Sequence, residues 1–459
     1  MHNRFHKHLL MAVLFAPAAL WAQSAPSDGA LFRGAAAKPT LQLSLKQAVD
    51  IALSPEGNAR VQIAEELIRQ AQARSAQARA ALLPNVDSSV SQQSQTRNLA
   101  AFGIRISLPV PGFTFPTFVG PFNVFDARAT ASQTVFDLSS IRRLQASRAG
   151  VTQAEAERES TQDQVRGQVA RAYLAALRAQ ASVETAKANV ELSEALLKLA
   201  NDQKAAGTGT GIEVTRAKVQ LANEKQKLLV AENDLTKAHL QLLRVMGLNL
   251  DATVELTERL SYTPVPGVTA QQAMQVALES RADWKAQAKR EETARLNQSA
   301  TRLERVPSLS LFADYGSIGS SIDHAIPTRT YGFAVRFPVF DGGRRDARRA
   351  ESSSQLRQEG IHTRDLRAQI ELDIRLALDS LRSADEQVKT AGEGLALSEN
   401  ELAQAQRRYK AGMGSSIEVT DAQTRLERAR DNRILALFNY NLARIDLNTA
   451  MGTIRQMIY

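Results

Sequence analysis

Cysteine is absent from all 459 residues of the chain. Disulfide bonds, thiolate metal sites and cysteine nucleophiles are therefore excluded. Histidine is also scarce, with six residues, and three of them fall within the first eight positions. The others, His239, His324 and His362, lie far apart in the sequence and lack metal-ligand spacing. We therefore predict that the protein is not an enzyme, and we expect no catalytic site, no metal site and no bound cofactor.

Long apolar stretches are missing as well, because no run after residue 22 reaches the roughly 20 residues of a transmembrane helix. The start of the chain combines basic Arg4 and Lys7 with a short apolar run that ends at Ala22. This layout predicts a secretory signal peptide over residues 1–22, followed by an N-terminal linker over 23–40. An exported chain without a transmembrane helix is periplasmic, secreted or inserted into a membrane as a β-barrel.

Basic residues outnumber acidic ones, and the formal net charge is +9. Outside the stretch from 344 to 349, however, Lys and Arg are interspersed with Glu, Asp and Gln. A dense basic patch of the kind that binds nucleic acid is not formed. We interpret the charge as a solvated helical surface and expect no nucleic-acid partner.

The chain contains an internal duplication. Residues 207–214 (GTGTGIEV) recur as 412–419 (GMGSSIEV), and residues 135–137 (VFD) recur as 339–341. A Met-Gly pair at 246–247 returns at 451–452, and these landmarks keep the same order in both halves. The sequence therefore predicts a first repeat over 41–250 and a second over 268–459, joined by a linker over 251–267.

Each repeat has the same predicted plan. Two helices come first, and a proline, Pro84 or Pro307, ends the second. Strands follow at about 86–103 and 124–137 in the first repeat, and at about 308–318 and 329–340 in the second. Very long helices then cover about 141–206 and 344–411, and a last helix runs back after a glycine-containing turn. Helices of this length span on the order of 100 Å, and their Ala and Leu stripe predicts lateral packing. The helices alone do not exclude a soluble coiled-coil rod.

The residue pattern of the strands indicates that they are inserted in a membrane. In the last strand, Tyr331, Phe333 and Val335 alternate with small or polar residues, whereas Phe312 breaks the alternation of the strand before it. Alternating segments of about ten residues are typical of membrane β-barrels. Four strands are too few to close a barrel, which needs about eight, so subunits would have to share it: two would give eight strands, and three would give twelve and room for a pore. A pair of hairpins on a soluble bundle is the alternative.

Residues 337–350 (FPVFDGGRRDARRA) resemble the strand-to-helix junction of the TolC-like outer-membrane efflux proteins, and residues 408–422 (RYKAGMGSSIEVTDA) resemble the periplasmic tip of that family. Residues 277–284 (ALESRADW) resemble the start of its second repeat. The resemblance implies a mainly α-helical homotrimer with a twelve-stranded β-barrel in outer-membrane lipid that continues into a twelve-helix α-barrel. It also implies docking of a periplasmic adaptor protein and an inner-membrane pump or ABC transporter at the tip.

The resemblance assigns roles to individual residues at the tip. Glu418 and Asp421 match acidic positions that narrow the pore entrance, and Glu213 and Tyr409 match positions that link helices in the closed gate. The basic partner usual in that network falls at Gly414, so Arg407, Arg408 or Lys410 would have to replace it. The alternative is that these carboxylates are ordinary exposed residues at helix starts, which the helix dipole favours.

Glycines mark the turns and the junction. Gly207, Gly209, Gly412 and Gly414 lie in the two tip turns, where we expect the adaptor to dock; Gly207 and Gly412 follow long helices, where a left-handed residue is common. Gly342 and Gly343 follow Asp341 and would give the strand-to-helix junction backbone freedom. Residues 108–125, with four prolines and five phenylalanines, are predicted to form the external loop of the first hairpin.

These observations predict an outer-membrane exit duct of a tripartite efflux pump or type I secretion system, a passive channel that extends into the periplasm. A periplasmic structural coiled coil without a pore is the alternative. An exported enzyme is a third possibility, which the lack of a catalytic constellation disfavours.

Overall fold

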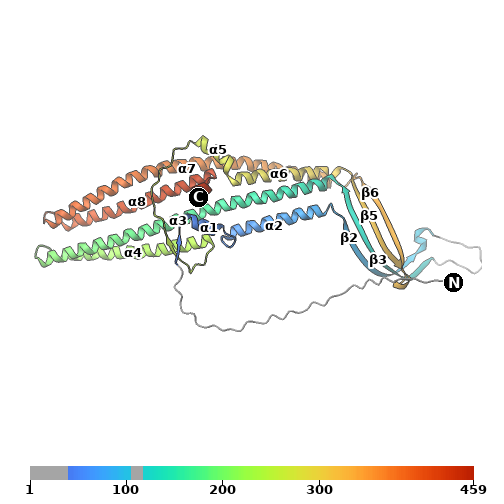
Figure 1. Ribbon diagram of the computed structural model, residues 1–459, viewed down its shortest axis with the longest axis horizontal. Helices are drawn as coiled ribbons and strands as arrows, with labels where there is room; N and C mark the ends of the chain where they lie inside the picture. The colour runs from blue at the N-terminus through green and yellow to red at the C-terminus, as the bar shows by residue number, and fades with distance from the viewer. Residues whose placement is uncertain (1–39, 105–116) are drawn as a thin grey trace, which may run out of the picture. The chain divides into compact units, whose positions relative to one another are not determined.

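The computed structural model describes residues 40–104 and 117–459. The predicted signal peptide and residues 23–39 of the predicted linker lie outside this part of the chain. Both repeats show the same order of elements, drawn in Figure 1. The first consists of α1 (Leu45–Leu53), α2 (Ala59–Ala80), β2 (Asn85–Asn98), η1 (Leu99–Phe102), β3 (Phe118–Phe136), α3 (Leu138–Ala205) and α4 (Gly211–Met246). The second consists of α5 (Ala270–Ser280), α6 (Ala282–Arg302), η2 (Leu303–Arg305), β5 (Ser308–Gly319), η3 (Ile322–His324), β6 (Ile326–Arg336), α7 (Arg344–Lys410) and α8 (Ser416–Met451), followed by α9 (Ile454–Ile458).

Each repeat starts with the same capping motif. Ser44 accepts a hydrogen bond from the backbone of Gln47 at 3.3 Å, and Thr269 accepts one from Gln272 at 3.3 Å. The glutamine side chains reach back to the cap residues and complete a capping box at α1 and at α5. The motif satisfies backbone N–H groups that a helix start leaves free, so it fixes where each repeat begins.

The long helices lie side by side in two pairs. The 68-residue α3 packs against the 36-residue α4 over the half that ends at the turn, and the 67-residue α7 packs in the same way against the 36-residue α8. Because each pair is joined by a short turn, its two helices run antiparallel (Figure 1). Contacts of α3 with α6 and α8 join the two repeats. None of the helices in residues 40–104 and 117–459 is both long enough and apolar enough to cross a membrane.

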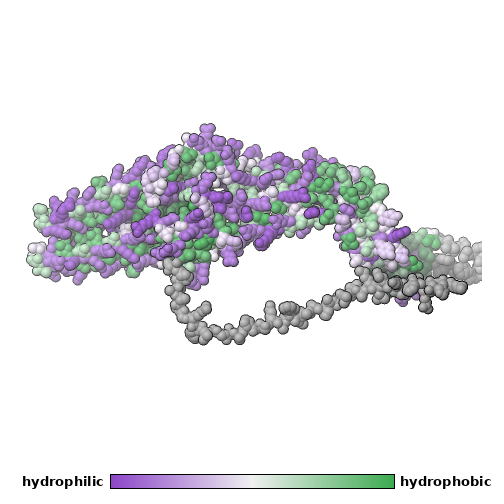
Figure 2. All heavy atoms as spheres, in the orientation of Figure 1, coloured by the Kyte–Doolittle hydropathy of each residue, from purple (hydrophilic) through white to green (hydrophobic). Residues whose placement is uncertain are grey.

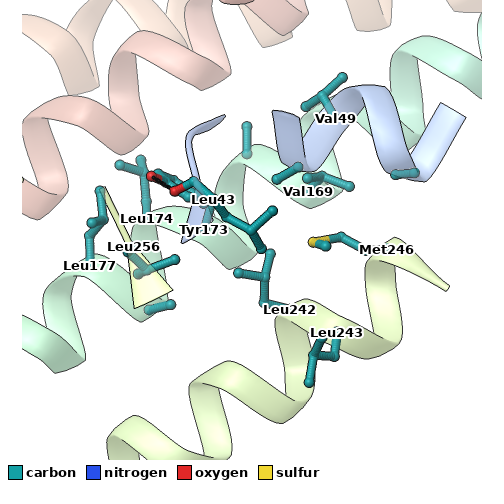
Figure 3. Packing of buried hydrophobic residues seen from close by; sticks show 14 of the residues in the cluster. Leu43, Val49, Val169, Tyr173, Leu174, Leu177, Leu242, Leu243, Met246 and Leu256 are labelled. Carbon is teal, nitrogen blue, oxygen red and sulfur yellow. Dashed lines mark hydrogen bonds between the residues drawn. The ribbon is translucent and has the colours of Figure 1, made fainter. Parts of the chain in front are cut away.

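The largest hydrophobic core lies where α1, α3 and α4 meet (Figure 3). Tyr173 of α3 is fully buried there, and its hydroxyl donates a hydrogen bond to the carbonyl of Leu43 at 3.0 Å. Leu43 ends β1 (Thr40–Leu43), which pairs in parallel with β4 (Thr253–Leu256). Part of the predicted 251–267 linker is therefore a strand, because Val254 and Leu256 alternate inward and are buried in this core.

The other four strands form one antiparallel sheet in the order β2-β3-β5-β6. Its register aligns the alternating residues of β3, β5 and β6, so that one face is mainly apolar and the other mainly polar. Leu311 lies opposite Phe333 on the apolar face, and Asp314 lies opposite Thr330 on the polar face. Phe312 is the exception on the polar face, where it lies opposite Gly332. A Cβ on Gly332 would come within 3.0 Å of the Phe312 ring, so the glycine makes room for the aromatic side chain.

Three strand boundaries differ from the predictions by four residues or more. The first strand ends at Asn98 and not near 103, because the 3-10 helix η1 follows it directly. The last strand ends at Arg336 and not near 340, since Pro338 has no N–H with which to continue the ladder and Pro307 precedes the partner strand. The second strand begins at Phe118 and not at 124. Residues 118–125 of the predicted external loop therefore belong to β3, while residues 105–116 lie outside the described part of the chain.

Candidate functional site

The two tip turns, between α3 and α4 and between α7 and α8, have the same backbone geometry. Gly207 and Gly412 adopt φ values of 75° and 70°. After α3, Gly207 N–H donates to the Lys204 carbonyl at 3.1 Å and Thr208 N–H donates to Gln203 at 2.9 Å. The equivalent bonds after α7 have the same pattern and lengths of 3.1 and 2.9 Å. Both helices thus end in a Schellman motif, in which a left-handed glycine lets the last carbonyls be satisfied.

The second glycine of each turn allows close backbone approach. A Cβ on Gly209 would lie 3.0 Å from the backbone nitrogen of Lys204. A Cβ on Gly414 would lie 3.1 Å from both Arg408 Cβ and Glu418 Oε2. These two positions therefore bring the start of the returning helix against the end of the long one, and at Gly414 the space is taken by a charged pair.

The carboxylates that follow the turns have different partners. Glu213 caps its own helix, because its Oε2 accepts a hydrogen bond from Thr210 N–H at 2.9 Å. Glu418 Oε2 instead accepts a hydrogen bond from Arg408 Nε at 3.3 Å, and Arg408 also donates to the Met413 carbonyl at 3.2 Å. Of the three basic residues that could replace the missing partner at Gly414, Arg408 is the one placed against an acidic tip residue. Both side chains of this pair are half exposed, so its strength in water is modest.

Tyr409 and Glu213 line the same small cavity between the two helix pairs, with a volume of about 30 Å³. Tyr409 is 7% exposed, and its hydroxyl has no hydrogen-bond partner among the described residues. Burial and the nearby charge of Glu213 raise the pKa of the Tyr409 hydroxyl. The structure therefore brings these two predicted gate residues to one place without a direct hydrogen bond.

Asp421 lies apart from this cavity. It is exposed and lines a groove of about 330 Å³ together with Ile212 and Val219 of α4 and Ile417 of α8. Glu418, one helical turn earlier, is held towards α7 by Arg408. Within one chain, the two predicted gate carboxylates therefore have different neighbours: Glu418 contacts α7, and Asp421 lies in the groove beside α4.

Polar links between the two repeats, just beyond the tip, were not predicted from the sequence. Gln423 Nε2 donates to Ser193 Oγ at 2.6 Å, and Arg430 donates to Asn189 at 2.7 Å. The spacing of Val419, Gln423 and Leu426 could have indicated this link. The three residues lie on one helix face, and Val419 and Leu426 belong to an apolar cluster, so a polar Gln423 between them needs a buried partner.

The strand-to-helix junctions are built differently in the two repeats. Asp137 caps α3 directly by accepting from Ser139 N–H at 3.0 Å. Asp341 is separated from α7 by Gly342 and Gly343, whose φ values are 69° and 85°. It accepts from both the backbone and the guanidinium of Arg345, and this hydrogen bonding lowers the pKa of the Asp341 carboxyl. The two glycines thus insert a bend that Asp341 holds in place.

Hydrophobic side chains gather where the helices meet the sheet, visible as green atoms in Figure 2. Phe337, Val339 and Phe340 are exposed there. In the described part of the chain, no group of three acidic or histidine side chains could hold a metal ion. Two helices on the order of 100 Å long, each followed by a turn and a shorter returning helix at one end and joined at the other end to a sheet with one apolar face, define the class of a membrane export channel subunit.

The family model of outer membrane efflux proteins matches residues 51–248 and 273–453, and the chain belongs to this family. It is an exit duct of an efflux system, located in the Gram-negative outer membrane and extending into the periplasm. The membrane interpretation is thereby favoured over a coiled-coil rod without a pore.

Relatives span most of the chain. It is 25% identical over 400 residues to the pyoverdine export outer membrane protein OpmQ of Pseudomonas putida, covering 84% of this chain and 81% of that one. It is 23% identical over 349 residues to the outer membrane protein TolC of Vibrio cholerae, with coverage of 73% and 78%. The crystal structure of VceC from Vibrio cholerae has a TM-score of 0.73 at 20% identity, covers 89% of this chain and 96% of its own, and shows the shared fold.

Proposed function

We propose that three copies of the chain form one passive channel, with a shared twelve-stranded β-barrel in the outer membrane and a twelve-helix barrel below it. The observation that carries this proposal is the sheet: among the described residues, β2 and β6 each pair on one side only. Unpaired strand edges are not tolerated in lipid, and four strands are too few to close a barrel. Three copies supply twelve strands and leave a bore.

The periplasmic tip is proposed to be the gate and the docking site. Glu418 and Asp421 would form rings of three carboxylates each at the entrance, and Tyr409 and Glu213 would hold the helix pairs together when the entrance is closed. The turns at Gly207, Gly209, Gly412 and Gly414 would receive a periplasmic adaptor protein, which connects the duct to an inner-membrane pump or ABC transporter. Support comes from the shared cavity of Tyr409 and Glu213 and from the Arg408–Glu418 pair.

Crosslinking of the sheet edges tests the assembly. The chain has no cysteine, so any crosslink must come from introduced residues. We would place one cysteine on each edge strand, Ser91→Cys on β2 and Thr330→Cys on β6. A bifunctional thiol reagent should convert the detergent-extracted double variant into covalent trimers, whereas each single variant should give no trimer. The same protein should conduct ions in a planar bilayer. Release from membranes without detergent, or a stable monomer with an intact sheet, would contradict the proposal.

A further inference from the structure

The apolar face of the sheet carries one charge. Along β5 and β6, residues that lie opposite each other share this face, and they form a ladder that starts near the helices and ends near the β5–β6 turn. Its successive pairs are Leu309–Val335, Leu311–Phe333, Ala313–Tyr331, Tyr315–Arg329 and Ser317–Pro327. Arg329 therefore stands in the fourth step of a row that is otherwise free of charge, directly opposite Tyr315 and beside Tyr331.

Arg329 has neither an ion pair nor a hydrogen bond among the described residues. The polar face offers a contrast, since Arg128 there is paired with Asp126 at 2.6 Å and with Asp314 at 3.6 Å. Tyr315 and Tyr331, on either side of Arg329, are 67% and 79% exposed. The arginine and two tyrosine rings thus point outward together, without an acid to neutralise the guanidinium.

The depth of Arg329 fits an interface between lipid and water. The apolar row continues past the end of the strand to Phe337 and Val339. Arg329 lies ten residues before Val339. Ten residues at about 3.3 Å each, tilted by about 40°, cover roughly 25 Å, which is the height of the apolar band of a membrane barrel. The β5–β6 turn lies at the strand ends remote from the long helices, and the helices extend into the periplasm. Arg329 therefore belongs to the outer leaflet.

Pairing with a second copy does not give Arg329 an acidic partner. In the proposed trimer, β6 of one copy meets β2 of the next. The acidic residue of β2 is Asp87, at the end near the helices, and residues 92–98 (QQSQTRN) contain no Asp or Glu. Apart from the basic Arg97, the outer half of the neighbouring strand therefore offers only amides and hydroxyls to Arg329.

We propose that Arg329, with the hydroxyls of Tyr315 and Tyr331, binds a phosphate group of the outer-leaflet glycolipid, lipid A. A guanidinium binds phosphate through two parallel hydrogen bonds, and arginine can extend along apolar surface to bring its charge to the interface. Tyrosine hydroxyls add donors at the same level, while the ladder from Leu309 to Tyr331 provides the apolar surface for acyl chains. This inference rests on the proposed membrane barrel.

Native mass spectrometry of the detergent-solubilised trimer tests the site. The probes are bisphosphorylated lipid A, the same lipid A with both phosphates removed, and phosphatidylglycerol. Arg329→Gln should weaken binding of bisphosphorylated lipid A about tenfold, as expected for one charge-assisted contact, and Arg329→Lys should retain part of it. Arg336→Gln, on the same strand but on the opposite face near the helices, is the matched control and should bind like the unchanged protein.

Three results would overturn the inference: equal affinity of Arg329→Gln, equal binding of dephosphorylated lipid A, or equal binding of phosphatidylglycerol. A chain that never forms trimers contradicts the proposed assembly. Trimers that bind lipid A regardless of residue 329 contradict the lipid site alone. Circular dichroism and the mass of the trimer verify that each variant is folded.

Discussion

Gln423 of α8 donates a hydrogen bond to Ser193 of α3, with 2.6 Å between Nε2 and Oγ, and both side chains are buried, at 3% and 1% exposure. The pair joins the two repeats one helical turn beyond Val419, next to the apolar cluster at the tip. A polar pair in such a place holds the helices in one register, because sliding either helix would leave a buried polar group without a partner.

Breaking this pair from one side should destabilise the tip. Gln423→Leu leaves the Ser193 hydroxyl buried without its partner, and we expect a loss of about 1–3 kcal/mol in the free energy of unfolding. The double variant Ser193→Ala with Gln423→Leu should recover much of that loss. Urea unfolding of the detergent-solubilised protein measures both, and Gln77→Leu on the exposed face of α2 is the control. A neutral single substitution would show that the pair does not hold the helices.

The tip turn depends on a left-handed backbone at residue 412. Gly412 has φ 70° and open space around its Cβ position, so Gly412→Val acts through the backbone and costs about 1–2 kcal/mol. We expect weaker adaptor crosslinking and reduced efflux, with normal membrane insertion. Gly360→Val, at an open glycine inside α7 that has no positive φ, is the control. Unchanged efflux and crosslinking in Gly412→Val would contradict a docking role for this turn.

A buried carboxylate on α4 makes stability depend on pH. Glu224 is 1% exposed, lies beside Gln220 and Lys227 of its own helix, and faces Glu427 and Asp431 of α8. Burial, together with the charge of Glu427, raises the pKa of the Glu224 carboxyl and that of Asp431 above their ordinary values.

The sign of the effect follows from proton binding. A raised pKa means that the folded state holds the proton more tightly than the unfolded chain, so its stabilisation is fully present below the ordinary glutamate pKa and is lost as pH rises through the raised value. Glu224→Gln removes this loss, and Lys227 still has Glu427 as a partner. We expect a higher thermal midpoint at neutral pH and a flatter pH profile above about 4.5. The exposed Glu232→Gln is the control, and parallel profiles would contradict the prediction.

Local features were predictable from the sequence because local chemistry determines them. The glycines of the tip turns and the alternation of β6 each depend on a few neighbouring residues. Features that depend on which elements meet were not predictable. The pairing of β1 with β4, the placement of Phe312 over Gly332 and the link between Ser193 and Gln423 require the tertiary arrangement. The family resemblance supplied candidate gate residues, but not the pairing of Glu418 with Arg408.

At the tip, Arg408 already neutralises Glu418, whereas Asp421 has no ion pair among the described residues. If these side chains line the entrance, symmetry gives two rings of three carboxylates, which concentrate cations and should bind multivalent ones.

Removing either carboxylate should therefore weaken these properties. Asp421→Asn should lower cation selectivity and multivalent-cation block in single-channel recordings. Glu418→Gln removes the same charge and leaves Arg408 unpaired, so it should lower both as well, and the double variant should combine the effects. Arg408→Gln is the opposite test and should increase cation selectivity. Trimers should form in every case, since these residues lie far from the sheet. Wild-type selectivity and block in the double variant would mean that both carboxylates are ordinary solvated residues at a helix start, and the gate proposal would fail.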